Sequence, residues 1–399
     1  MRSPARLLLP ILVVSAGLAS LHYLPRLSAL AFILRASKPH GPLGRLARMT
    51  AISVARQPIR TVATRHGQVA TQLYQPARAA HRTVLLVPGL HMDGLAEERL
   101  VGLATDLAAS GLQVLTVAPP DLMRYRVSTD SVDQLEDVAH WATEQPTLAP
   151  DGKVALAAVS FAGALAVVAA GRAAIKDRVA FVLSLGGYAD LPRVLRYLCG
   201  ETLDLATAVP GESIWVTGWQ HIRVPKPNDY GAVVALLNLG DRLVPGAQVP
   251  LLEKAITEFL RASSIDRTLP ERAQAILAEV RQLGDSLPEP SRTLVKEVSE
   301  RDVDQLGRAL QTTLAALELP AALSPDRSPA PLAPVFLLHG ADDSVVPASE
   351  MVWLARYLHA KTRVRALASR LISHAEINPG AAWSEMLQLS SFFSDLMGR

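Results

Sequence analysis

A chain of 399 residues can bury a full hydrophobic core, and its length allows one large or two ordinary domains. Its single cysteine, Cys199, excludes an intramolecular disulfide and argues against a cysteine-based metal site. Twelve Lys and Arg residues and no acid precede Asp93, whereas the remainder carries 28 basic and 37 acidic residues. A basic front on an acidic body argues against a nucleic-acid partner and fits an arm that lies near anionic lipid headgroups.

The N-terminal region contains one candidate membrane segment. Residues 7–24, LLLPILVVSAGLASLHYL, carry no charge and are just long enough to cross a bilayer, since a span needs about 20 apolar residues. More basic residues follow this segment than precede it, which places the body on the cytoplasmic side. The alternative is a signal peptide cleaved near Ala19, after which the body would be exported. Because the cleavage site is poor, we predict an anchor and basic arm over 1–58 and a membrane-associated protein.

From residue 59 the chain alternates strands and helices. Residues 59–76 are typical of a hairpin around His66 and Gly67. Continuous apolar runs typical of strands buried on both faces follow, and the helix-length stretches between them imply parallel crossovers. The expected strands are 82–89, 112–120, 153–160 and 178–187; the expected helices are about 95–110, 131–145 (beginning at Ser131) and the stretch after Ser160.

The strand pattern stops between about 190 and 330. Apolar residues such as Ile256, Phe259 and Leu260 recur at helical spacing there, so we predict a mainly helical insertion over 191–332. The proline-rich stretch 323–334 is interpreted as the hinge back into the sheet, and 226–246 is not expected to be helical throughout. A strand at 333–340, a helix at 348–359, a strand at 362–369 and a helix at about 381–397 follow. Segments 59–190 and 333–399 are thus predicted to form one α/β core.

Three polar residues follow predicted strands at the edge where open parallel sheets bind ligands. Ser160 follows the third parallel strand, Asp343 follows the strand at 333–340, and His374 follows the last strand. Taken singly, they are typical of a helix N-cap, a turn and a loop histidine, and His339 is expected to be structural. Together they supply the nucleophile, carboxylate and base that acyl transfer by a serine requires.

The chain resembles the α/β-hydrolase family of serine hydrolases over residues 59–190 and 330–397, in the motifs LLVPGLHMDG, AVSFAG, HGADDSVVP and SHAEIN. The resemblance implies an α/β-hydrolase fold: a mostly parallel central sheet flanked by helices, with a helical cap inserted after the strand that follows the nucleophile helix. The segment HGADDSVVP places the acid at Asp343 rather than Asp342. The segment AVSFAG departs from G-x-S-x-G, because Ala158 and Ala162 replace both glycines, although small residues there still permit the tight turn.

The resemblance also implies an oxyanion hole made of two backbone N–H groups. One belongs to Phe161, directly after the nucleophile, and the other to Leu90 in VPGLHMDG, where Gly89 lets the backbone approach the substrate. His91 is expected to line the substrate pocket without a catalytic role. No metal and no cofactor are expected.

The chemistry predicted is hydrolysis of carboxylic esters through a Ser160–His374–Asp343 triad and an acyl-enzyme. Trp215, Trp219 and Phe259 in the insertion favour an apolar acyl chain, and a membrane anchor points to lipid esters. One alternative is a non-catalytic lipid-binding protein of the same fold, motivated by the two alanines and by Pro88, which stands where the family usually has histidine. The other is an acyltransferase that uses the same triad.

Overall fold

The computed structural model describes residues 26–37, 42–203, 216–266, 268–373, 376–377 and 383–399. The predicted membrane segment at 7–24 lies outside these residues. Within the described ranges, no helix combines the length and the apolar character needed to cross a membrane.

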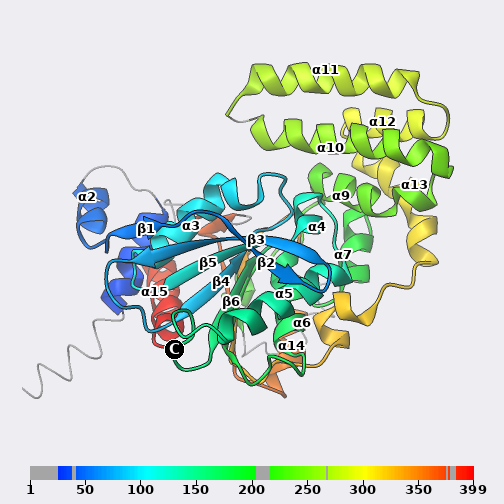
Figure 1. Ribbon diagram of the computed structural model, residues 1–399. Coiled ribbons are helices and arrows are strands. Elements are labelled where there is room, and N and C mark those ends of the chain that lie inside the picture. Colours follow the sequence, from blue (N-terminus) through cyan, green and yellow to red (C-terminus); the bar gives the residue numbers. More distant parts are fainter. Residues whose placement is uncertain (1–25, 38–41, 204–215, 267, 374–375, 378–382) are drawn as a thin grey trace, which may run out of the picture.

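A ten-stranded sheet forms the centre of the molecule (Figure 1). Its order is β1–β3–β5–β4–β6–β7–β9–β10–β8, with β2 paired to β3. Strands β1, β2 and β5 pair with β3 in the antiparallel direction, and all pairings from β5 to β8 are parallel. The strands are β1 (Val54–Arg56), β2 (Arg60–Thr64), β3 (Gly67–Pro76), β4 (Thr83–Val87), β5 (Gln113–Ala118), β6 (Val154–Val159), β7 (Val179–Leu185), β8 (Val216–Thr217), β9 (Val335–Gly340) and β10 (Val364–Ser369); β11 (Ile372–Ser373) and β12 (Glu376–Ile377) form a separate pair.

The α-helices of the described chain follow the predicted pattern closely. They are a helix over residues 26–36, α2 (Pro42–Met49), α3 (Glu98–Ala108), α4 (Pro120–Met123), α5 (Thr129–Thr143), α6 (Phe161–Ala170), α7 (Leu191–Leu198), α9 (Asp229–Leu239), α10 (Val249–Ile265), α11 (Pro270–Ser286), α12 (Ser291–Ser299), α13 (Val303–Ala315), α14 (Ser349–His359) and α15 (Trp383–Met397). Short 3-10 turns are η1 (Gly94–Ala96), η2 (Trp219–His221), η3 (Gly240–Arg242), η4 (Gly246–Gln248), η5 (Ala321–Leu323) and η6 (Pro325–Arg327). Helix α5 begins at Thr129 instead of the expected Ser131, because the Ser128 side chain caps it by accepting a hydrogen bond from Ser131 N.

Helices cover both faces of the sheet, which explains the unbroken apolar strands. Leu85 of β4 packs in the core beneath α5 and α6, whereas its neighbours Val84 and Leu86 pack in the second core with α3 and α15. Because side chains alternate between the faces of a strand, a strand covered on both sides favours apolar residues at most positions and on both faces.

The helix over 26–36 packs against the second core. The ring of Phe32 lies 4.7 Å from the ring of Phe393 in α15. Arg35 is 9% exposed and donates a hydrogen bond to the hydroxyl of Ser110 at 2.6 Å. This basic residue of the N-terminal region is therefore bonded to the α/β core.

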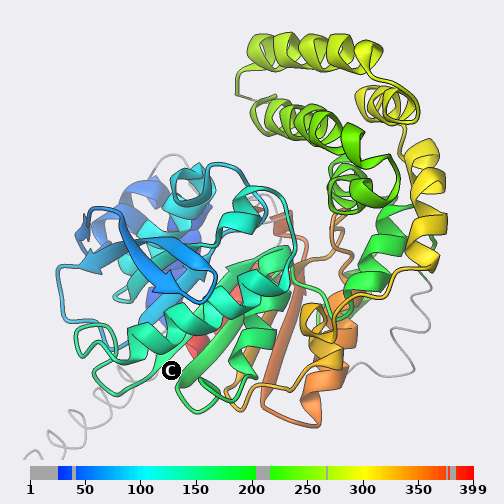
Figure 2. The same cartoon turned by 45° about the vertical axis from the view of Figure 1, so that its right-hand side comes forward.

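The chain between β7 and β9 is largely helical, and α10, α11 and α12 stand farthest from the sheet (Figures 1 and 2). It also contributes β8, which pairs with the edge of β10, so the expectation that strands are absent from this region was wrong by one short strand. The stretch 226–246 is helical only in part, as expected, with α9 and η3 covering Asp229 to Arg242. Phe259 is fully buried and lies under the guanidinium of Arg301 at 5.3 Å, so it packs helices together and offers no surface to a ligand.

The proline-rich return at 323–334 is a packed structure. Ser324 is fully buried, and its hydroxyl accepts a hydrogen bond from Leu191 N at the start of α7. The carbonyl of Ala189 accepts from Asp326 N at 3.2 Å. The two ends of the insertion are therefore bonded to each other at its base.

This base contains a carboxyl group whose protonation favours folding. Oδ1 of Asp326 is buried with no hydrogen-bond partner among the described residues. Burial, followed by the charges of Asp190 and Glu350, raises the pKa of Asp326 from 3.8 to about 6. Because the folded-state pKa lies above the unfolded one, the stability that this group contributes is present below about pH 4 and is lost as the pH rises through 6.

We expect Asp326→Asn to raise the free energy of unfolding by about 1 kcal/mol at pH 8, after allowance for solvent screening, and to change it little at pH 4. Urea denaturation at the two pH values measures the difference. Asp285→Asn, at an exposed position of α11, is the control and should be neutral at both. An equal gain at both pH values for Asp326→Asn would rule out the protonation of this carboxyl as the cause.

Candidate active site

Ser160 occupies the turn between β6 and α6. Its backbone angles are φ 56° and ψ −136°, a combination that costs a residue with a side chain about 1–3 kcal/mol. The turn is held by hydrogen bonds from Ser160 N to the carbonyl of Leu185 at 2.6 Å and from Gly163 N to the carbonyl of Ser160 at 2.8 Å. The Ser160 side chain does not cap α6, so the N-cap interpretation does not apply. The strained turn instead presents this side chain at the carboxyl end of the sheet.

The turn forms although Ala158 and Ala162 replace the expected glycines. Both alanines are fully buried. The close approach of backbone occurs one residue later, where a Cβ atom on Gly163 would lie 2.5 Å from Oγ of Ser184 and 3.3 Å from Cα of Gly187. The sequence motif did not identify Gly163 and Gly187, because their need for small size depends on the contact between α6 and the segment after β7.

Asp343 lies in the loop after β9 and is 3% exposed. Its Oδ1 accepts hydrogen bonds from Val345 N at 2.8 Å and Val346 N at 3.1 Å. His339, 1% exposed, lies with Nε2 2.8 Å from the carbonyl of Val346 and 3.6 Å from Oδ2 of Asp343, so it buttresses the turn that carries the carboxylate. Asp342, by contrast, is exposed.

Ser160 and Asp343 both lie next to Gly186, the residue after β7. A Cβ atom on Gly186 would lie 3.6 Å from Oδ2 of Asp343 and 4.0 Å from Cα of Ser160. The pairing of β9 with β10 ends at Gly340 and Ser369, so the chain leaves β10 beside the end of β9, the strand that precedes Asp343. His374 follows five residues later and lies outside the described residues.

The loop after β4 lies against the candidate nucleophile. A Cβ atom on Gly89 would lie 3.2 Å from Cβ of Ser160 and 3.9 Å from its Oγ. Leu90 is buried, and its carbonyl oxygen accepts a 2.8 Å hydrogen bond from the hydroxyl of Tyr230 in α9. Phe161 is also buried, as the first residue of α6. The structure thus brings both expected N–H donors to the turn that holds Ser160.

His91 and Trp219, two of the residues expected to line the pocket, differ in their burial and contacts. Nδ1 of His91 accepts a hydrogen bond from Asp93 N at 3.3 Å, and burial lowers the pKa of His91 despite the opposing charges of Glu97 and Asp93. Trp219 is 40% exposed and follows Gly218, which lies against the carbonyl of Ala368 at the end of β10. Trp215 lies outside the described residues.

The order of these features along the chain identifies the architecture. A serine on a strained strand-to-helix turn is followed by a buried acid after a later parallel strand, at the same edge of the sheet. The chain has the α/β-hydrolase fold. Ser160 lies on the turn after β6 and Asp343 in the loop after β9, at the same edge of this sheet.

Several solved structures have a similar arrangement. They include an esterase from Pyrobaculum calidifontis (14% identity, covering 88% of this chain and 89% of that one, TM-score 0.42) and brefeldin A esterase, described as a bacterial homologue of human hormone-sensitive lipase (13%, 94% and 84%, 0.43). A thermostable esterase from Pseudomonas putida is 14% identical, with 93% and 96% of the two chains covered and a TM-score of 0.44. No protein-family model matches the chain, and no curated protein matches it in sequence. Because the identities are this low, the fold is assigned from the strand order and turn geometry of this chain.

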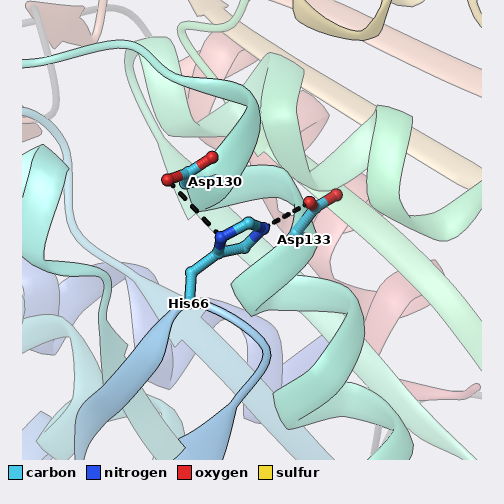
Figure 3. A group of neighbouring side chains, drawn as sticks. All are labelled: His66, Asp130 and Asp133. Carbon is cyan, nitrogen blue, oxygen red and sulfur yellow. Dashed lines mark hydrogen bonds and ion pairs between the residues drawn. The ribbon is translucent and has the colours of Figure 1, made fainter.

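A second group of polar side chains lies on the β2–β3 hairpin and α5. Figure 3 shows Asp130 and Asp133 on opposite sides of the His66 ring: Nε2 lies 2.7 Å from Oδ2 of Asp133, and Nδ1 lies 3.6 Å from Oδ2 of Asp130. Asp133 also accepts a hydrogen bond from Arg172, and Arg65 lies 3.9 Å away. Because Asp133 contacts both His66 and Arg172, we interpret the cluster as one that fastens the hairpin to α5.

Proposed function

We propose that the protein hydrolyses carboxylic esters with Ser160 as nucleophile, His374 as general base and Asp343 as the carboxylate that orients the base. The observation that supports this proposal best is the strained turn at Ser160, which lies next to Gly186, as does the buried carboxylate of Asp343. A strained serine is maintained only where the surrounding structure enforces it, and such strain is concentrated at functional sites.

The reaction proceeds through an acyl-enzyme. Oγ of Ser160 attacks the ester carbonyl carbon while His374 takes the hydroxyl proton, and the N–H groups of Leu90 and Phe161 stabilise the negative oxygen. The tetrahedral intermediate collapses, and the departing alcohol receives the proton from His374. A water molecule then attacks the acyl carbon while His374 takes one of its protons. His374 returns this proton to Oγ of Ser160 as the carboxylic acid departs, which regenerates the free enzyme. The carboxylate of Asp343 stabilises the imidazolium in both halves of the reaction.

We infer an ester with an apolar acyl group as the substrate class. His91 and Trp219, together with Trp215, are proposed to line the pocket, and the inserted helices are proposed to cover it as a cap. Phe259 no longer supports this inference, because it is buried between helices. An N-terminal anchor at 7–24 that would hold the enzyme at a membrane, with lipid esters as substrates, is part of the same proposal.

Activity-based labelling tests the assignment. The full-length protein should react with a fluorophosphonate probe at Ser160, and a series of p-nitrophenyl esters from acetate to palmitate should reveal the preferred acyl length. A folded protein that remains unlabelled, and from which intact lipid co-purifies, would contradict catalysis and favour the lipid-binding alternative. Capture of the acyl group by an added alcohol in preference to water would identify an acyltransferase.

The approach of Gly89 to Ser160 gives a further prediction. Gly89→Ala places a methyl group 3.2 Å from Cβ of Ser160, so the loop and the Ser160 turn must separate by a few tenths of an ångström. We expect this separation to displace the Leu90 N–H. Because one lost oxyanion donor costs about 100-fold to 1,000-fold in kcat, we expect a displaced donor to lower kcat by about 10-fold. Steady-state kinetics on a p-nitrophenyl ester measures this. Gly102→Ala is the control: a Cβ there has nothing within 4 Å, so its kcat should equal that of the wild type, and the same value for Gly89→Ala would contradict the placement of the loop.

A further inference from the structure

Helix α9 of the insertion contacts the loop after β4 through the side chain of Tyr230. Its hydroxyl donates a 2.8 Å hydrogen bond to the carbonyl oxygen of Leu90, the residue whose N–H group is proposed as an oxyanion donor. We propose that Tyr230 is a positioning residue for the oxyanion hole, acting on the hole through the backbone of Leu90. The inference rests on the proposed function and assigns a catalytic support to a helix of the insertion.

The loop that carries Leu90 is held at more than one place. Gly89 lies against Ser160, as described above. Tyr230 holds the carbonyl of Leu90, and the carbonyl of His91 accepts from Gly94 N at 3.2 Å. The peptide groups that follow Leu90 and His91 are both held by hydrogen bonds, and Gly89 packs against Ser160, which together restrict the backbone that carries the Leu90 N–H group. Oxyanion donors must keep their geometry within about 0.5 Å to stabilise the transition state in full.

The helix that carries Tyr230 is itself anchored to the core. Near the end of α9, Nδ2 of Asn238 donates to the carbonyl of Tyr125 at 2.9 Å, and its Oδ1 accepts from Val127 N at 3.1 Å. The ring of Tyr125 meets the ring of Tyr230 edge-on, with centroids 6.4 Å apart. Helix α9 is thus attached to the core at both ends, which makes Tyr230 a fixed support.

The hydroxyl of Tyr230 is a donor over the whole range of assay pH. Burial, followed by the neighbouring Tyr125, raises the pKa of Tyr230 above its ordinary value. The proton therefore stays on the oxygen in the alkaline range where esterase assays are run, and the hydrogen bond to Leu90 is retained.

The test compares Tyr230→Phe with Tyr357→Phe. Tyr357, on α14, also donates its hydroxyl to a backbone carbonyl, that of Ser328 at 2.5 Å, but it is not in the active-site loops. On a p-nitrophenyl ester, Tyr230→Phe should lower kcat about 10-fold with KM changed less than about twofold, because the bond supports a geometry used in the transition state. A trifluoromethyl ketone, whose hemiketal oxygen would occupy the oxyanion hole, should bind about 10-fold more weakly. Tyr357→Phe should match the wild type in both measurements.

A rescue variant separates positioning from general loss of structure. Replacement of Tyr230 by 4-aminophenylalanine keeps an N–H donor at the para position and should restore most of kcat. If Tyr230→Phe does not fold, 4-fluorophenylalanine, which fills the space of the hydroxyl without donating, takes its place in the comparison.

Unchanged kcat and inhibitor affinity in the variant that lacks the donor would overturn the positioning role. Equal losses in Tyr357→Phe, or no rescue by 4-aminophenylalanine, would overturn it as well. A wild-type protein that fluorophosphonate does not label at Ser160 would instead overturn the proposed function, so the two failures are distinguishable.

Discussion

Replacement of Ser160 by alanine should lower kcat for a p-nitrophenyl ester by at least about 10,000-fold, because no other group can form the acyl-enzyme. We expect Asp343→Asn to lower kcat by about 1,000-fold to 10,000-fold. Val345 N and Val346 N direct the side-chain oxygen of the asparagine toward themselves, which leaves an NH₂ group where the carboxylate would accept from the base. Initial rates, with thermal unfolding as a check of the fold, measure both effects.

Asp342→Asn is the matched control for the acid. Asp342 is adjacent in sequence and exposed, whereas Asp343 is 3% exposed and lies next to Gly186, as Ser160 does. We expect kcat of Asp342→Asn to stay within about twofold of the wild type. An inactive Asp342→Asn beside an active Asp343→Asn would reverse the assignment of the acid.

Arg193→Met should lower the free energy of unfolding by about 3–5 kcal/mol, the largest stability effect that we expect in this chain. Glu350 is fully buried at the start of α14, and its carboxylate accepts from Ala189 N, Asp190 N and two guanidinium nitrogens of Arg193. Burial lowers the pKa of Arg193, but the hydrogen bonds and charge of Glu350 outweigh burial and hold that pKa above its ordinary value. Without Arg193, the buried carboxylate keeps only its backbone donors.

Two further variants test the reason for this loss. Arg196→Met, on the same helix, removes an exposed pair with Glu201 at 3.3 Å and should cost less than about 1 kcal/mol. Adding Glu350→Gln to Arg193→Met removes the unpaired charge and should recover part of the stability. Urea denaturation at pH 7 gives the three free energies. If Arg193→Met lowers the free energy of unfolding by no more than Arg196→Met does, the Arg193–Glu350 pair does not stabilise the base of the insertion.

Much of the fold and part of the site could be predicted from local sequence. Continuous Val, Leu and Ala runs placed every strand from β4 to β7 and from β9 to β10, because a strand covered by helices on both faces is apolar at most positions. Ser160 and Asp343 could be predicted as site residues because they follow strands at the edge where parallel sheets bind ligands. The motif HGADDSVVP distinguished Asp343 from Asp342, and the buried position of Asp343 agrees with that choice.

The sequence by itself therefore determined the succession of strands and helices along the chain, since this succession follows from hydrophobic periodicity within short windows. Contacts between distant segments were decided only in the tertiary structure. The need for glycine appears at Gly163 and Gly187, because it is set by how closely α6 meets the segment after β7. Phe259 is buried between inserted helices, and Tyr230 reaches Leu90, 140 positions earlier in the chain. No local pattern encodes such pairings, because they depend on which surfaces meet once the sheet and the insertion are assembled.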